Sequence, residues 1–178
     1  MATRRQAREW ALQLLVQLDL NPEPEFRLDA VLEEFWQQLR EIEFEKLADD
    51  DRVERVLNFD SQDKVRADAF AEAKEFTEER IRGVKAAQTA IDKTLEGRLA
   101  HWSLYRLGTV ERNVLRLGIW ELDNCPEIPV PIVINECVDL AKFFSETKSG
   151  RFVNGVLDKY AKDRRREAND ADMADFTP

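Results

Sequence analysis

The stretch HWSLYRLGTVERNVLRLGIWEL, residues 101–122, decides the fold class. Its apolar side chains fall on most sides of a helix, which leaves little polar surface to face water. A helix of this kind is buried among other elements, so we expect it at the centre of a helical bundle. Thr109 is its expected N-cap.

Two further helices are predicted after this central one. Proline has no N–H to donate, so Pro126, Pro129 and Pro131 keep residues 125–131 out of a helix interior. Pro131 suits the first turn of a helix over 131–144, and Ser149 is the expected cap of a last helix over 150–162. Their expected core residues are Val133, Ile134, Cys137, Val138, Ala141, Phe144, Phe152, Val153, Val156, Leu157, Tyr160 and Ala161.

The N-terminal half shows the same helical spacing, over residues 4–20, 25–48 and 61–96. Thr3 is the expected N-cap of the first helix, whose core stripe is Ala7, Trp10, Ala11, Leu14, Leu15 and Leu18. No segment alternates like a strand. We therefore predict an all-α protein with one domain over 1–166, built of two antiparallel helical bundles at about 3–96 and 97–162. The acidic tail, 167–178, is predicted to be disordered.

Composition narrows the class of protein. The chain has 178 residues, of which 43 % are hydrophobic and 35 % charged, with a formal net charge of −9. It is long enough to bury a core, lacks the roughly 20 apolar residues that span a bilayer, and shows no apolar signal segment. Cys137 falls inside a helix, which argues against a disulfide framework. We expect a cytoplasmic protein that does not contact a membrane.

The sequence offers no constellation for catalysis. His101 is the only histidine and is better read as a packed or surface residue than as a base, while Cys125 and Cys137 form no CxxC pair. Glycine-rich phosphate loops and the common hydrolase and metalloprotease motifs are missing. We therefore expect no catalytic residue, no metal site, no cofactor and no enzyme activity.

The charges are distributed unevenly. Residues 21–80 hold 19 acidic against 9 basic side chains, a net charge of −10, whereas RRQAREWALQLL, residues 4–15, opens with Arg4, Arg5 and Arg8. A cation at a helix N-terminus is disfavoured by about 0.3–1 kcal/mol, and Glu9 pairs with Arg5 only in the weaker orientation. Either the arginines are a solvated helix terminus, or something outside the helix requires them.

Three blocks in order carry a family resemblance. They are LRLGIWEL at 115–122, INECVDLAKFF at 134–144 and RFVNGVLDK at 151–159, preceded by the arginine-rich opening with AREWA at 7–11. Together they closely resemble the NusB family of bacterial transcription antitermination factors. The resemblance covers about residues 3–20 and 75–161. Residues 21–70 do not align and are longer and more acidic than is usual in the family.

The resemblance implies two antiparallel helical bundles without a cofactor. It also implies binding of the BoxA element of nascent ribosomal RNA, a single-stranded RNA, jointly with the small-subunit ribosomal protein NusE, within the RNA polymerase antitermination complex. The side chains that we expect to contact RNA are Arg4, Arg5, Gln6, Arg8, Lys148, Arg151 and Phe152. Those expected at the interface with the partner protein are Glu111, Arg112, Asn135 and Glu136.

Several alternatives stay open at this point. Val16 stands where relatives carry an aromatic residue, and Lys148 where an acid occurs. Phe152 has the spacing of a core residue as well as a position suited to stacking on a base. The chain could instead be a protein-binding or self-associating adaptor that works through its acidic segment, or a module related to those of ribosomal RNA cytosine methyltransferases. A homodimer, the role of the segment 21–80 and the preferred RNA sequence are left undecided.

Overall fold

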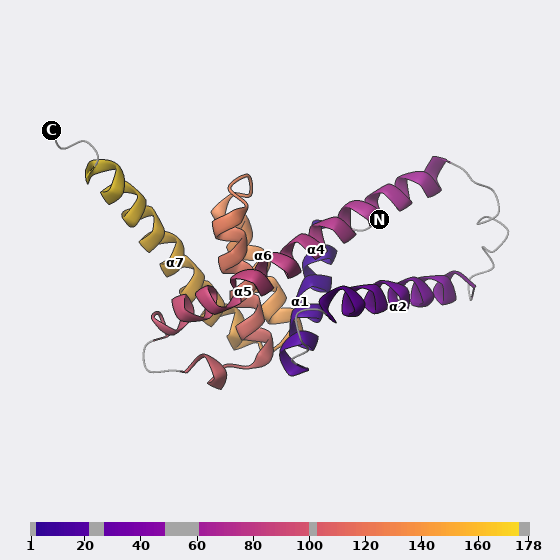
Figure 1. Cartoon of the computed structure of the whole chain (residues 1–178), viewed down its shortest axis with the longest axis horizontal. Helices are drawn as coiled ribbons and strands as arrows, with labels where there is room; N and C mark the ends of the chain where they lie inside the picture. The colour runs from indigo at the N-terminus through magenta and orange to yellow at the C-terminus, as the bar shows by residue number, and fades with distance from the viewer. Residues whose placement is uncertain (1–2, 22–26, 49–60, 100–102, 175–178) are drawn as a thin grey trace. The chain divides into compact units, whose positions relative to one another are not determined.

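The regular elements of the described chain are all helical (Figure 1). The computed structural model describes residues 3–21, 27–48, 61–99 and 103–174, apart from the side chains of 42–48, 61–66, 147 and 168–174. The elements are α1 (Arg4–Leu20), α2 (Leu28–Ala48), α4 (Ser61–Glu96), the short 3-10 turn η2 (Leu104–Arg106), α5 (Thr109–Asn124), α6 (Val130–Phe144) and α7 (Thr147–Ala174). This confirms the all-α class.

Helix α1 has the bounds and the core that its sequence predicts. The hydroxyl of Thr3 accepts a hydrogen bond from the backbone N–H of Gln6 at 3.1 Å, so the predicted N-cap is present. All six residues of the predicted stripe are buried. At the other end, the backbone N–H of Asn21 donates to Gln17. Local sequence therefore determines this helix at both ends.

The chain divides into two compact units, and the first comprises residues 1–79. An aromatic cluster joins its helices: the ring centroid of Trp10 in α1 lies 5.6 Å from that of Trp36 in α2 and 5.8 Å from that of Phe70 in α4. The Thr77 hydroxyl, on α4, donates to the carbonyl of Ala7 at 3.0 Å. Because Ala7 pairs with Thr77 while Trp10 meets Phe70, α1 and α4 run antiparallel.

The second unit, residues 80–178, consists of the rest of α4 and the elements that follow it. Helix α5 packs against both α6 and α7, and these two also pack against each other. Leu115 of α5 is fully buried, as its central position predicts. At Gly118 a Cβ would lie 2.8 Å from a Leu157 methyl and 3.0 Å from the Cys137 sulfur, so only glycine permits the close approach of these helices.

Two buried ion pairs fasten α4 to α5 within the second unit. Arg80 Nε lies 2.5 Å from Glu121 Oε1, and both side chains are almost fully buried. Arg116 makes two hydrogen bonds to the carboxylate of Asp92, at 2.7 and 2.8 Å. Breaking a buried pair leaves an uncompensated charge, so both pairs fix the register between the helices.

Several boundaries differ from the sequence-based ones. The two units divide within α4, between Glu79 and Arg80, whereas α4 itself ends at Glu96; the sub-bundle boundary near 97 stays a prediction. Gly108, not Thr109, is the N-cap of α5. Helix α7 begins at Thr147 and continues to Ala174, so Ser149 lies inside its first turn and is not the cap. Residues 167–174 of the predicted disordered tail continue α7, and residues 175–178, like His101, lie outside the described residues.

Candidate nucleic-acid interface

The two N-terminal arginines of α1 are available at its surface. Arg4 is exposed, with its guanidinium carbon 4.5 Å from the ring centroid of Phe76. Arg5 is half-buried and pairs with Glu9 at 3.2 Å, as the spacing of four residues predicts. Gln6 is half-buried beside them. An arginine held over an aromatic ring keeps its charge and its outer N–H groups, so Arg4 can still bind a phosphate.

Arg8 corrects one expectation. Its position in the sequence predicts that it lies beyond the core stripe, but only 4 % of its surface is exposed, and its guanidinium carbon lies 5.2 Å from the ring centroid of Phe76. Phe76 is distant in sequence, so the spacing within α1 cannot reveal this packing. Arg8 therefore helps to hold the first unit together, and its contact with RNA stays a prediction.

In the second unit, Glu111 of α5 is bound to the start of α7. Its Oε1 accepts a hydrogen bond from the hydroxyl of Ser145 and another from that of Ser149, each at 2.5 Å. Burial by itself would raise the pKa of Glu111, but these hydrogen bonds and one from its own backbone outweigh it, so the pKa lies below its usual value of 4.5. At neutral pH the side chain is thus a carboxylate that holds the α6–α7 turn.

Two glycines of the same region lie close to flexible side chains. A Cβ at Gly108 would meet Oε2 of Glu111, and one at Gly150 would lie 2.8 Å from Cγ of Lys142, so a larger residue at either position requires that side chain to move. The carboxylate therefore lies directly against the N-cap of α5, where the positive end of the helix dipole favours it. Glu111 is positioned by three segments at once.

The RNA-contacting residues predicted on α7 lie at its surface. Lys148 and Arg151 are exposed, and 37 % of Phe152 is exposed. The expectation that Phe152 belongs to the core is wrong, because its α7 neighbours Val153 and Leu157 are the ones that are fully buried. The beginning of α7 thus presents two cations and an aromatic face together. The ring can stack on a base while the cations bind phosphates.

The residues predicted at the partner interface do not all reach the surface. Arg112 is 8 % exposed and donates to the carbonyl of Leu107, so it belongs mainly to the packing of α5. Its guanidinium carbon lies 5.7 Å from the ring centroid of Tyr105, which is 71 % exposed. Tyr105 is a surface aromatic that the sequence does not single out, because it stands within the apolar stretch 101–122 that is expected at the centre of a bundle. The structure places it in the short turn η2 instead.

Asn135 and Glu136 lie on α6, away from the Glu111 cluster along the helix. Asn135 is exposed and Glu136 is half-buried. Asn135 lines an open groove of about 270 Å³ between α6 and α7, with Val130, Pro131, Ile134, Asn154, Asp158, Ala161, Lys162 and Arg165. The lining of this groove combines apolar residues of both helices with charged residues of α7.

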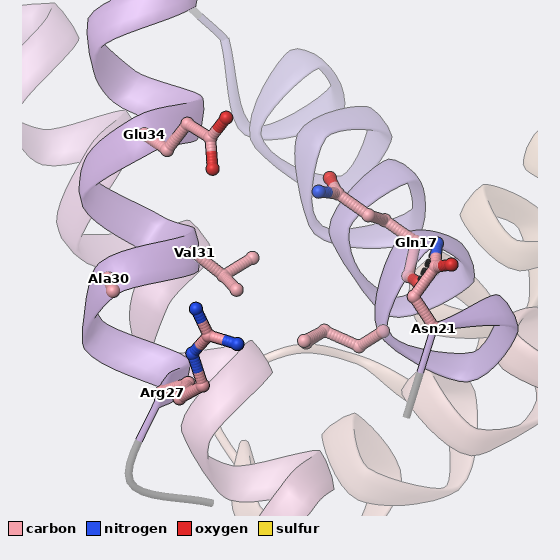
Figure 2. Close-up of a pocket in the computed structure, with 7 residues that line it drawn as sticks. Gln17, Asn21, Arg27, Ala30, Val31 and Glu34 are labelled. Atoms are coloured by element: carbon pink, nitrogen blue, oxygen red, sulfur yellow. Dashed lines mark hydrogen bonds between the residues drawn. The ribbon is translucent and has the colours of Figure 1, made fainter. Parts of the chain in front are cut away.

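A second groove, of about 250 Å³, lies in the first unit between the end of α1 and the start of α2 (Figure 2). Its lining includes Gln17, Asn21, Arg27, Val31 and Glu34. Figure 2 shows the Asn21 side chain turned back onto α1, where it donates to the carbonyl of Gln17 at 3.4 Å. None of the predicted contact residues lines this groove.

The predicted contact residues thus form two sets. One belongs to the first unit, at the start of α1, and the other belongs to the second unit, around α5, α6 and the start of α7.

None of the helices in the described part of the chain is long and apolar enough to cross a membrane.

Comparison with known proteins identifies the family. The transcription antitermination protein NusB of Anaeromyxobacter sp. (strain Fw109-5) is 37 % identical over 158 residues, which cover 89 % of each chain. The solved structure of T. maritima NusB aligns with a TM-score of 0.67 and 32 % identity, covering 91 % of this chain and 93 % of that one.

A structure of the antitermination factors NusB and NusE in complex with dsRNA aligns with a TM-score of 0.60 and 30 % identity, covering 89 % of this chain and 96 % of that chain. The model of the NusB family matches residues 37–162. This chain belongs to the NusB family.

Proposed function

We propose that this protein is an RNA-binding transcription antitermination factor. It binds the BoxA element of nascent ribosomal RNA together with the ribosomal protein NusE, and this complex acts on RNA polymerase during elongation. The observation that carries the proposal is the start of α7, where the exposed side chains of Lys148, Arg151 and Phe152 combine cations with an aromatic ring. The structure of a NusB in complex with NusE and dsRNA, 30 % identical to this chain, supports it.

The chemistry of this surface suits unpaired RNA. Single-stranded RNA exposes base faces that stack on aromatic side chains, and its phosphates attract lysine and arginine. Arg4 and Arg5 of the first unit supply further phosphate contacts in this proposal. The segment 21–80, with its net charge of −10, opposes RNA wherever it comes near, so we expect the protein alone to bind weakly.

NusE supplies the remaining affinity in this proposal. Glu111, Asn135 and Glu136 are the side chains that we assign to its interface, with Arg112 as a largely buried support of α5. A basic partner adds surface to the complex and orders one continuous path for the RNA. The function needs no catalysis, and we place the protein in the cytoplasm, where transcription occurs.

A gel-shift experiment tests the proposal. A BoxA-containing leader RNA and a scrambled RNA of equal length are each titrated with the protein, with and without NusE. We expect weak binding by the protein alone and tighter, BoxA-selective binding when NusE is present. Equal binding of the two RNAs in the presence of NusE would contradict the proposal. Retained binding of NusE without any RNA binding would favour the adaptor alternative.

A further inference from the structure

The outward face of α7 carries a row of cations that continues well past the residues assigned above. Lys148, Phe152, Gly155, Lys159, Lys162 and Arg166 follow one another at spacings of four, three, four, three and four residues. At 3.6 residues per turn this pattern keeps them on one side of the helix. We name these six residues the α7 stripe. Each of them is exposed.

The stripe is long enough for several nucleotides. With a rise of 1.5 Å per residue, Lys148 and Arg166 lie about 27 Å apart along the helix. Phe152 and the cation Lys148 stand at one end, and three more cations follow toward the other end. A row of cations with an aromatic ring is how proteins follow a single strand without reading its sequence.

Most of this charge is not neutralised by the side chains that the structure describes. Lys162 pairs with Asp158 at 2.6 Å, whereas no ion pair joins Lys148, Lys159 or Arg166 to any side chain that the structure describes. Two further acidic residues, Asp163 and Glu167, lie near the stripe, and Oδ2 of Asp163 lies 3.8 Å from Nε of Arg98. The stripe therefore keeps a net positive charge that is exposed to solvent.

Arg164 is directed differently from the stripe. It pairs with Asp123 at 2.9 Å and donates to the backbone carbonyls of Leu122 and Asp123. These carbonyls belong to the last turn of α5, so Arg164 stabilises the end of that helix. The arginine run 164–166 is thus divided between a structural role and the exposed stripe.

Gly155 adds an independent observation. It lies in the interior of α7, where glycine is the poorer helix former compared with alanine. A Cβ placed at Gly155 would meet no heavy atom within 4 Å, so packing inside the described protein does not require a glycine there. At Gly118, by contrast, the neighbouring helices exclude a Cβ. Close approach of something outside the protein would account for Gly155.

From these observations we propose that the α7 stripe is a second part of the RNA-binding surface, which binds the ribose–phosphate backbone of single-stranded RNA beyond Phe152 as far as Arg166. The inference rests on the proposed RNA-binding function. It adds that the RNA backbone runs along α7 from Phe152 to Arg166. Contacts of this kind are made to phosphates, so they act on any RNA of sufficient length.

The test compares two double variants of equal charge. Lys159→Ala/Arg166→Ala removes two stripe cations, and Lys93→Ala/Arg106→Ala removes two exposed cations of the same unit that lie elsewhere. Affinity is measured by fluorescence anisotropy at several salt concentrations. The probes are a short RNA that contains only BoxA, the same RNA extended by roughly ten nucleotides on each side, and a scrambled RNA of the extended length.

We expect the stripe variant to lose up to about 1.4 units from the slope of log affinity against log salt on both long RNAs, since each phosphate contact to a single strand contributes about 0.7. The loss on the short RNA should be smaller. The control variant should keep the slope of the wild type. If the salt slope of the stripe variant on the long RNAs equals that of the control variant, the inference is overturned. The same result is expected if the stripe binds an acidic protein surface and not RNA.

Gly155→Ala separates binding from folding. Alanine favours the helix, so the midpoint of thermal unfolding should stay equal or rise, while affinity for the long RNAs should fall at least threefold because the added methyl group obstructs the backbone. Unchanged affinity for those RNAs would show that RNA does not approach α7 closely at Gly155. Failure of the wild type to prefer BoxA over the scrambled RNA overturns the proposed function instead, because the stripe effect is expected on both long RNAs.

Discussion

Oε1 of Glu111 in α5 and the hydroxyl of Ser149 in α7 lie 2.5 Å apart, a hydrogen bond between residues 38 positions apart in the sequence. Ser145 donates to the same oxygen atom. One carboxylate thus connects the start of α5 to both ends of the α6–α7 turn. Lys148, in the first turn of α7, precedes Ser149 in the chain and so lies next to this bond.

Replacing both serines should change the pH dependence of stability. The lowered pKa of Glu111 means that its contribution to stability is fully present above about 4.5, its value in an unfolded chain, and is lost as the pH falls through the folded pKa. Ser145→Ala/Ser149→Ala should therefore be less stable than the wild type at pH 7 and closer to it at pH 3. Urea unfolding gives the free energies of unfolding of both proteins at the two pH values. A difference between variant and wild type that is the same at both pH values would contradict the role of the serines in lowering the pKa of Glu111.

Leu115→Ala should destabilise the protein by roughly 2–5 kcal/mol, the usual cost of emptying a fully buried leucine site. Leu20→Ala is the matched control, since Leu20 is 63 % exposed and surface changes usually stay within about 0.5 kcal/mol. Equilibrium unfolding in urea gives both values. Equal effects of the two substitutions would place Leu115 outside the core.

Glu121→Ala should cost about 3–5 kcal/mol, because it leaves the Arg80 guanidinium buried without its carboxylate at 2.5 Å. Replacing both partners, as in Arg80→Met/Glu121→Leu, should cost less than the single change because no uncompensated charge is left. Unfolding free energies of the two variants and the wild type check the order. A double variant that is less stable than Glu121→Ala would show that the uncompensated charge of Arg80 is not the main cause of the destabilisation.

Glu111→Ala should weaken binding of NusE while leaving the protein's own affinity for RNA nearly unchanged or slightly higher, since a negative charge is removed near Lys148. Calorimetry with NusE and anisotropy with RNA measure the two affinities separately. Loss of RNA binding with intact NusE binding would assign Glu111 to the RNA side of the surface instead.

Much of the fold could be predicted from local sequence. The Thr3 cap, the stripe of buried residues in α1 and the turn at Asn21 all act within a few residues, and α1 has the predicted bounds. The burial of Leu115 follows from the apolar character of its own helix. Local sequence therefore predicted the cap and the core of α1 correctly, whereas the caps expected at Thr109 and Ser149 were wrong.

Less of the candidate site could be predicted, because its main contacts join segments that are far apart in the sequence. Arg8 is buried beside Phe76, and Ser149 serves Glu111 instead of capping its own helix. Neither partner lies within one turn of the residue in question, so helical spacing carries no signal for it. Tyr105 was missed because it stands within the apolar stretch 101–122 that is expected at the centre of a bundle, whereas the structure places it in a short turn.

The salt dependence of RNA binding by Arg4→Ala/Arg5→Ala tests the central claim most directly. These two cations can be removed without opening the core, unlike the buried Arg8. In the complex with NusE and BoxA RNA, we predict a loss of up to about 1.4 units from the slope of log affinity against log salt, at 0.7 per phosphate contact, with little change in thermal stability. A slope and affinity equal to those of the wild type would show that the basic start of α1 is only a solvated helix end, and would contradict the account.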